Sequence, residues 1–169
     1  MHSAWRRAAV GKFFSISTPL CTYVYDVLVA RDRRPSETSP RVLIADDKGD
    51  TREMYELYLN MAGYRVDTAK DGHEAILKAR ALRPDLVVMD LQMPKLDGWA
   101  AIRELRSRAE TAAIPVIVLT GHDFKAYLKP AALAAGVVSY LMKPCFPEQL
   151  AREVGACLTV RGNRATSAL

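Results

Sequence analysis

The chain has 169 residues, of which 50% are hydrophobic and 25% are charged, with a formal net charge of +5. This length accommodates one compact domain with a short tail or two, and the composition excludes a fibrous or largely disordered protein. The positive charge is compatible with nucleic acid or anionic lipid as a partner.

Much of that positive charge lies before residue 40. Residues 1–39 carry a net charge of +3, which leaves +2 for the rest of the chain. Beyond Ser39 the acids and bases are interspersed and form no basic stripe. The folded part is therefore not an obvious polyanion binder, and DNA binding is the weakest of the functions considered. We expect no DNA-binding domain, because the residues after Leu158 are too few to form one.

The three cysteines, Cys21, Cys145 and Cys157, form no close pair, so neither a disulfide framework nor a zinc site is predicted. A reducing cytoplasm is the expected location. No apolar run approaches the ~20 residues that a membrane span needs. Arg6 and Arg7 resemble the positively charged start of a signal peptide, but no clean apolar segment follows them.

The first boundary falls in residues 33–40, where prolines, hydroxyl residues and charges leave nothing to bury. Residues 1–40 are interpreted as an extension, with three alternatives: a disordered leader, a docking segment or the product of an upstream start codon. The pattern then predicts one domain over residues 41–158 and a short tail over residues 159–169.

Short apolar runs alternate with stretches of helical period from Arg41 onward, which predicts successive βα units and a parallel sheet. Three of the five runs are continuously apolar, as expected of strands covered on both faces. The predicted strands are residues 42–45, 64–67, 86–89, 116–119 and 137–141.

The clearest helical stripe consists of Met54, Leu57, Tyr58 and Met61, and it predicts that this side of a helix is buried against the sheet. Weaker pairs mark three later helices: Ile76 with Ala79, Ile102 with Leu105, and Leu150 with Val154.

Five strands alternating with five helices predict a flavodoxin-like, doubly wound α/β fold, with a five-stranded parallel sheet of strand order 2-1-3-4-5. Gly63 and Gly136 stand just before predicted strands, where glycine commonly ends a helix. In such folds ligands bind beyond the carboxyl ends of the strands.

Polar residues follow four of the five runs at that edge: Asp46 and Asp47, Asp90, Thr120 and Lys143. Carboxylates gathered at one edge repel one another unless a cation joins them. Magnesium prefers oxygen ligands, so the sequence predicts a site for Mg²⁺, or for Mn²⁺ in its place.

Asp90 ends the middle run and is the candidate nucleophile, because an aligned carboxylate can attack a phosphoryl group and form an aspartyl phosphate. Lys143 supplies a point charge for phosphoryl oxygens, and Thr120 a hydroxyl donor. Each residue alone has a plainer reading, as a helix cap, a surface charge or a turn residue. Their occurrence together favours a site.

The stretch Asp90-Leu-Gln-Met-Pro-Lys-Leu-Asp-Gly98 closely resembles the receiver domain of two-component response regulators. Asp46-Asp47 precedes it, and Thr120-Gly121 and Tyr140-Leu-Met-Lys143-Pro144 follow it in the expected order. The resemblance covers residues 41–158.

The resemblance implies that Asp90 is the phosphoacceptor of a sensor histidine kinase or a histidine phosphotransfer protein. It implies that Mg²⁺ is held by Asp47, Asp90 and the backbone carbonyl of Gln92, with Asp46 assisting.

Thr120 and Tyr140 then correspond to a switch pair, with Lys143 binding the phosphoryl group. The switch would remodel the face of the fourth helix, fifth strand and fifth helix toward a downstream protein target. A phosphorylation-dependent homodimer is a further expectation.

The same resemblance assigns tuning or structural roles to other positions near the site. Gln92, Gly121 and His122 would influence phosphoryl lifetime and access, although His122 has an equal reading as an exposed loop residue. Pro94, Asp97, Gly98 and Pro144 would be structural, with Lys143-Pro144 matching a cis peptide of the family.

Pro130 departs from the family pattern, because it falls within the expected fourth helix and the spacing from Thr120 to Lys143 is one residue longer than expected. Proline is tolerated in the first turn of a helix, so we expect the fourth helix to start at Pro130. The output face is therefore less transferable than the site.

Only eleven residues follow Leu158, so we expect a stand-alone response regulator without a catalytic output domain, and not an enzyme. Two alternatives remain. An aspartate-nucleophile phosphatase usually needs an acid two residues after the nucleophile, where this chain has Gln92 and Lys48. A receiver-like scaffold would keep the fold and signal without phosphate.

Overall fold

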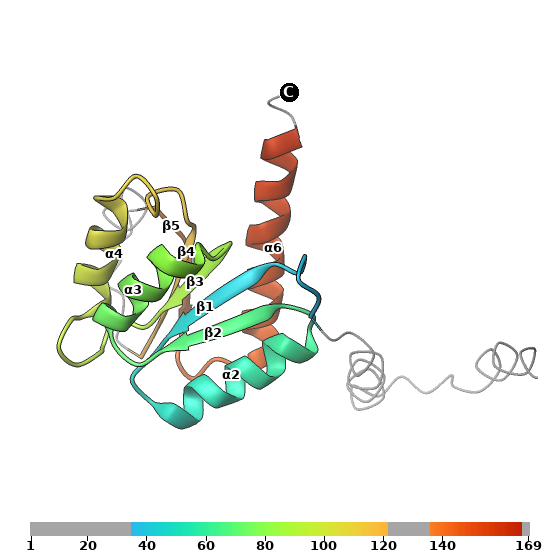
Figure 1. Ribbon diagram of the computed structural model, residues 1–169. Coiled ribbons are helices and arrows are strands. Elements are labelled where there is room, and N and C mark those ends of the chain that lie inside the picture. Colours follow the sequence, from blue (N-terminus) through green and yellow to red (C-terminus); the bar gives the residue numbers. More distant parts are fainter. Residues whose placement is uncertain (1–34, 122–135, 167–169) are drawn as a thin grey trace, which may run out of the picture.

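The computed structural model describes residues 35–121 and 136–166, with side chains described as far as residue 160 (Figure 1). Five parallel strands form one sheet in the order β2-β1-β3-β4-β5, which confirms the predicted fold and strand order. The strands are β1 (Arg41–Ala45), β2 (Arg65–Ala69), β3 (Leu86–Met89), β4 (Val116–Thr120) and β5 (Val137–Met142).

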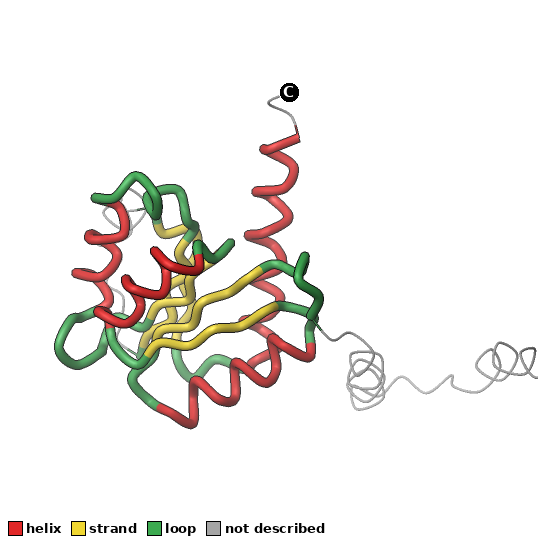
Figure 2. Tube along the Cα trace, viewed as in Figure 1, coloured by secondary structure: helices red, strands yellow, loops and turns green. Residues whose placement is uncertain are grey.

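Helices cover both faces of this sheet (Figures 1 and 2). Their bounds are α2 (Gly49–Met61), α3 (Gly72–Leu82), α4 (Gly98–Arg106) and α6 (Pro147–Thr166). Side chains of α2 and α6 pack in one core, and those of α3 and α4 pack in the other. The helix expected at Pro130 lies outside the described residues.

The helix α6 runs past residue 158, where the predicted domain ends, to Thr166. Every helix in the described part of the chain is too short or too polar to cross a bilayer.

Each central strand divides its apolar side chains between the two cores. Val42 and Ile44 of β1 pack on the side of α2 and α6, whereas Leu43 and Ala45 pack on the side of α3 and α4. All four are buried. Because both faces are covered, a central strand needs an unbroken apolar run, which explains why β3 matches its predicted bounds.

The edge strand β2 differs from its prediction because it is only partly buried along most of its length. It starts at Arg65 and continues to Ala69, pairing residue by residue with β1 from Arg41 to Ala45. Gly63 and Gly136 have φ angles of +94° and +73°, the left-handed conformation expected of glycines before these strands.

The prediction that the stripe through Met54 and Leu57 is the buried side of α2 is wrong. Leu57 is 65% exposed and Met54 is 42% exposed, whereas Tyr55 and Leu59 are buried. The Tyr55 hydroxyl donates a hydrogen bond of 2.8 Å to the backbone carbonyl of Cys145, so the ring can be buried without leaving the hydroxyl unsatisfied. The weaker pairs are buried as predicted: Ile76, Ala79, Ile102, Leu105, Leu150 and Val154.

Candidate functional site

The pairing of β1 with β3 brings two acids together at the carboxyl edge of the sheet. Ala45 lies opposite Met89, so the next residues, Asp46 and Asp90, end neighbouring strands. The Asp90 amide donates to the Ala45 carbonyl at 2.8 Å. Carboxylate oxygens of Asp46, Asp47 and Asp90 lie within 4.8 Å of one another, with Asp46 and Asp90 buried and Asp47 exposed.

Lys143 places a positive charge between the two buried acids. Its ammonium donates to Asp46 Oδ2 and to Asp90 Oδ2, each at 2.5 Å. Burial of the ammonium lowers its pKa, but the hydrogen bonds to Asp46 and Asp90 outweigh that effect and the pKa of Lys143 is raised. The ammonium therefore stays charged and offsets the repulsion between the acids.

The backbone around Lys143 is held by the neighbouring strand. The Lys143 amide donates to the Thr120 carbonyl at 2.9 Å, and the Lys143-Pro144 peptide bond is cis. Tyr55 holds the next residue, Cys145, through its hydroxyl. The loop after β5 is thus fastened to both β4 and α2.

The expected switch residues lie on β4 and β5. Thr120 is the last residue of β4 and is fully buried. Tyr140 pairs with Val118 across the two strands and packs, partly buried, against the core on the side of α3 and α4. Gly121 is exposed, and a Cβ added there would meet no atom of the described residues within 4 Å. His122 lies outside the described residues.

Backbone amides fix the second oxygen of each buried acid. The Gln92 amide donates to Asp90 Oδ1 at 3.0 Å, and the Lys48 amide donates to Asp46 Oδ1 at 2.9 Å. These two-residue turns orient the carboxylates toward Lys143 and Asp47. The Gln92 side chain is exposed.

Arg52 and Tyr55 support the site but were not predicted from the sequence. The Arg52 guanidinium donates to the Asp46 carbonyl at 2.7 Å, which ties the first turn of α2 to the end of β1. Arg52 and Tyr55 follow the N-cap residue Lys48 by four and seven positions, about one and two helical turns, and this spacing was the available signal. Periodicity alone, however, does not say which face of a helix meets the sheet.

The donor set suits a hard divalent cation. Three carboxylates within 4.8 Å supply oxygen ligands only, as Mg²⁺ and Mn²⁺ prefer. Asp46, Asp47, Asp90 and the Gln92 backbone carbonyl are the groups that would hold the ion.

The loop after Asp90 is shaped by Asp97 and Gly98. Asp97 accepts a hydrogen bond from the Ala100 amide at 2.8 Å and caps α4. The Gly98 amide donates to the Leu91 carbonyl at 3.1 Å. A Cβ added at Gly98 would lie 2.1 Å from the Asp90 carbonyl oxygen, so only glycine fits there. Pro94 is exposed in the same loop.

The same loop is fastened to α3 through Asp71. The Asp71 carboxylate accepts hydrogen bonds from Lys95 Nζ at 2.6 Å and from the Glu74 amide at 2.9 Å. The bond from Lys95, followed by that from Glu74, lowers the pKa of Asp71. The Gly72 amide donates to the Leu96 carbonyl at 3.3 Å. The segment from Asp90 to Gly98 is therefore also held in its middle, by contacts of Lys95 and Leu96 with the start of α3.

The sequence profile of the response regulator receiver domain matches residues 42–155, so the chain belongs to this family. The transcriptional regulatory protein PrrA of Mycobacterium tuberculosis is 41% identical over 130 residues, which cover 77% of this chain and 54% of that protein. The chain thus spans about half the length of the curated relatives it matches.

Solved structures agree with the family. The chemotaxis response regulator CheY4 of Vibrio cholerae matches with a TM-score of 0.66 and 32% identity, covering 71% of this chain and 99% of that one. The receiver domain of a sensor histidine kinase from Pseudomonas aeruginosa matches with a TM-score of 0.65 and 30% identity, over 72% of this chain and 99% of that one. That structure holds a magnesium ion in its active site cleft.

We expect Gly98→Ala to lower the free energy of unfolding by about 2 kcal/mol or more, because the added methyl group meets backbone atoms that cannot move aside alone. Urea denaturation measures this. Gly49→Ala is the matched control: its nearest neighbour would be a flexible Arg52 atom at 3.8 Å, and its effect should stay within about 1 kcal/mol. Equal effects of the two variants would contradict the close approach.

Asp71→Asn should flatten the dependence of stability on pH in the acid range. Because the pKa of Asp71 is lower in the folded protein, its carboxylate stabilises the fold above about pH 4, and this contribution is lost as the pH falls through the folded-state pKa. Urea unfolding of both proteins between about pH 2 and pH 6 tests this. An identical slope in the two proteins would contradict it.

Proposed function

We propose that the chain is a phosphorylation-dependent response regulator whose Asp90 receives a phosphoryl group from a sensor histidine kinase or a histidine phosphotransfer protein. The observation that carries this proposal is the ammonium of Lys143, held at 2.5 Å from both Asp46 and Asp90. A cation in this position neutralises the buried acids before the reaction and can bind phosphoryl oxygens after it.

In the proposed reaction a carboxylate oxygen of Asp90 attacks the phosphorus of a phosphohistidine. A new O–P bond forms and the N–P bond breaks, and the electron pair remains on the imidazole nitrogen of the donor. The Gln92 amide, 3.0 Å from Asp90 Oδ1, orients the nucleophile, and Lys143 draws the transferred group toward the site. Bound Mg²⁺ or Mn²⁺ would supply further positive charge against the phosphoryl oxygens.

We further propose that Thr120 and Tyr140 report the phosphorylation. Thr120 ends β4 beside the acids, and Tyr140 lies on the edge strand β5. Attraction of the Thr120 hydroxyl to the phosphoryl group would shift an equilibrium between two arrangements of β4 and β5. One of these arrangements would present β5 to a downstream protein or to a second copy of the chain.

The chain would act as a switch and not as an enzyme with turnover. An aspartate-nucleophile phosphatase usually needs an acid two residues after its nucleophile, and the exposed Gln92 stands there. We place the protein in the cytoplasm, where the thiols of Cys145 and Cys157, both free of disulfides, are kept reduced. Signalling by the domain alone remains a prediction, because PrrA is about twice as long as the match.

Incubation with acetyl phosphate and Mg²⁺ should add the mass of one phosphoryl group to the wild-type protein and none to Asp90→Asn. Intact-mass spectrometry measures this. Asp50→Asn, which changes an exposed acid of α2, should be labelled like the wild type. An unlabelled wild type, or a labelled Asp90→Asn variant, would refute the proposed phosphoacceptor.

Asp47→Asn should weaken Mg²⁺ binding by about tenfold or more, because it removes one anionic ligand of the proposed set. Since Asp47 is exposed, the fold should be unaffected. Titration calorimetry with magnesium chloride measures the affinity, and Asp50→Asn again serves as the control. An unchanged affinity in Asp47→Asn would exclude this residue as a ligand.

A further inference from the structure

One side of α2 exposes apolar residues that the core does not use. At 100° per residue, this side lies opposite the buried residues Tyr55 and Leu59. We call it the α2 outer face, and it consists of Asp50, Glu53, Met54, Leu57 and Met61.

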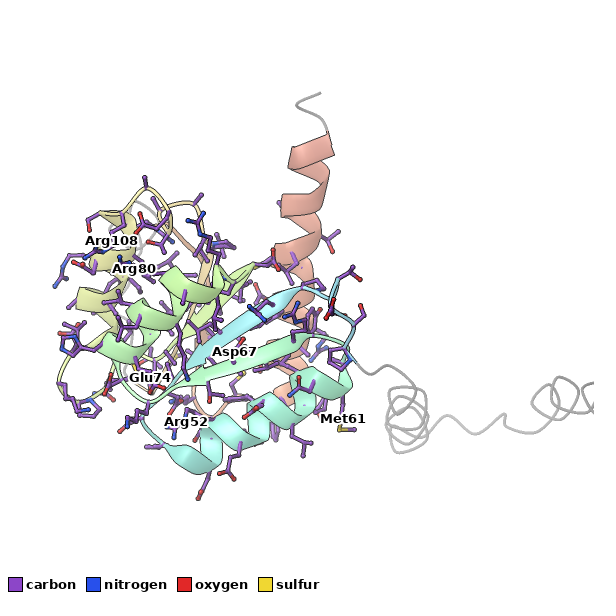
Figure 3. The ribbon with its side chains drawn as sticks, in the orientation of Figure 1. Arg52, Met61, Asp67, Glu74, Arg80 and Arg108 are labelled. Atoms are coloured by element: carbon purple, nitrogen blue, oxygen red, sulfur yellow. The ribbon has the colours of Figure 1, made fainter. Side chains whose placement is uncertain are left out.

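Leu57 lies near the middle of the α2 outer face and is 65% exposed, with Met54 exposed beside it. Figure 3 shows Met61 at the C-terminal end of the same helix. A helix that already buries its other side in the core normally presents polar residues to solvent, so apolar residues here indicate a binding surface.

The described chain begins near the C-terminal end of α2 (Figure 1). Arg65, which follows the end of α2 by four positions, donates a hydrogen bond of 2.6 Å to the Glu37 carbonyl. The Arg65 amide also donates to the Pro40 carbonyl at 2.9 Å. The 34 residues that precede Pro35 are therefore tethered next to the C-terminal end of α2.

The composition of this preceding segment matches the α2 outer face. Residues 23–30 read Tyr-Val-Tyr-Asp-Val-Leu-Val-Ala, with a single charged residue among apolar ones. Residues 31–34 read Arg-Asp-Arg-Arg and carry a net charge of +2. The last turn of α2 has no basic residue. The C-terminal end of a helix attracts cations.

The tether also has the right length. The step from Met54 to Met61 spans about 10 Å along the helix axis, whereas eight extended residues span about 26 Å. Residues 31–34 can therefore lie at the C-terminal end of α2 while residues 23–30 run back over Leu57 and Met54. A short tether gives an effective concentration in the millimolar range, which favours this segment over a second copy.

We propose that residues 23–30 of the same chain dock on the α2 outer face, with residues 31–34 at the C-terminal end of α2. The docking depends on neither phosphorylation nor the metal. It selects the docking segment among the alternatives for residues 1–40, and it gives the apolar residues of the α2 outer face an intramolecular partner.

Hydrogen–deuterium exchange on the full chain tests the proposal with two matched variants. Leu57 and Leu77 are 65% and 64% exposed, but Leu77 lies on α3, across the sheet. Peptides covering residues 23–30 should exchange about tenfold more slowly in the wild type and in Leu77→Glu than in Leu57→Glu. Unprotected residues 23–30 in the wild type, or equal protection in both variants, would overturn the proposal. Protection that disappears on dilution would indicate a second copy and would also overturn it.

A thiol measurement gives an independent result if Leu57→Glu perturbs the fold. Cys21 precedes the docking residues by two positions. Under mild oxidation with diamide, Met54→Cys should form an intramolecular disulfide with Cys21 faster than Leu77→Cys does, because docking brings the thiols within bonding distance. Peptide mapping of the monomer identifies the bond. Equal rates in the two variants would contradict docking on α2.

Discussion

The organisation of the site depends on the repulsion between two buried carboxylates and its relief by one lysine. Asp46 and Asp90 are forced together because β1 and β3 are hydrogen-bonded neighbours in the sheet. Two buried carboxylates at this edge repel each other unless a cation lies between them. Lys143 provides that cation from the far side of β4, and its attachment to Thr120 and to Tyr55 through Cys145 links the charge pair to the whole sheet edge. A bound metal ion or a phosphoryl group would change the charge around Lys143, whose loop is hydrogen-bonded to β4 and α2 and follows β5.

The motif from Asp90 to Gly98 combines chemical and structural residues. Asp90 contributes its carboxylate, whereas Asp97 caps α4 and Gly98 allows the chain to pass over the Asp90 carbonyl. Asp71 and Lys95 hold the middle of this loop against α3. The position of Asp90 therefore depends on contacts with β1, α3 and α4, and a substitution that leaves the carboxylate intact can still displace it.

The helix α2 shows the limit of reading periodicity alone. Its sequence contains two apolar stripes, and the longer one, through Met54 and Leu57, predicted the wrong buried face. The shorter stripe, Tyr55 and Leu59, is buried, and the Tyr55 hydroxyl donates to the Cys145 carbonyl, a partner 90 positions away in the sequence. Met54 and Leu57 of the longer stripe are then left exposed at the surface.

The sequence by itself determined the parallel sheet, its strand order and the residues at its carboxyl edge, because strands covered on both faces need unbroken apolar runs that end where the polar residues begin. Only the tertiary structure decided which face of α2 is buried and that Arg52 and Tyr55 support the site. It alone showed that Lys143 reaches both Asp46 and Asp90, 97 and 53 positions away. These contacts join segments distant in the sequence, and their geometry depends on how helices pack on the sheet, which no local pattern of residues encodes.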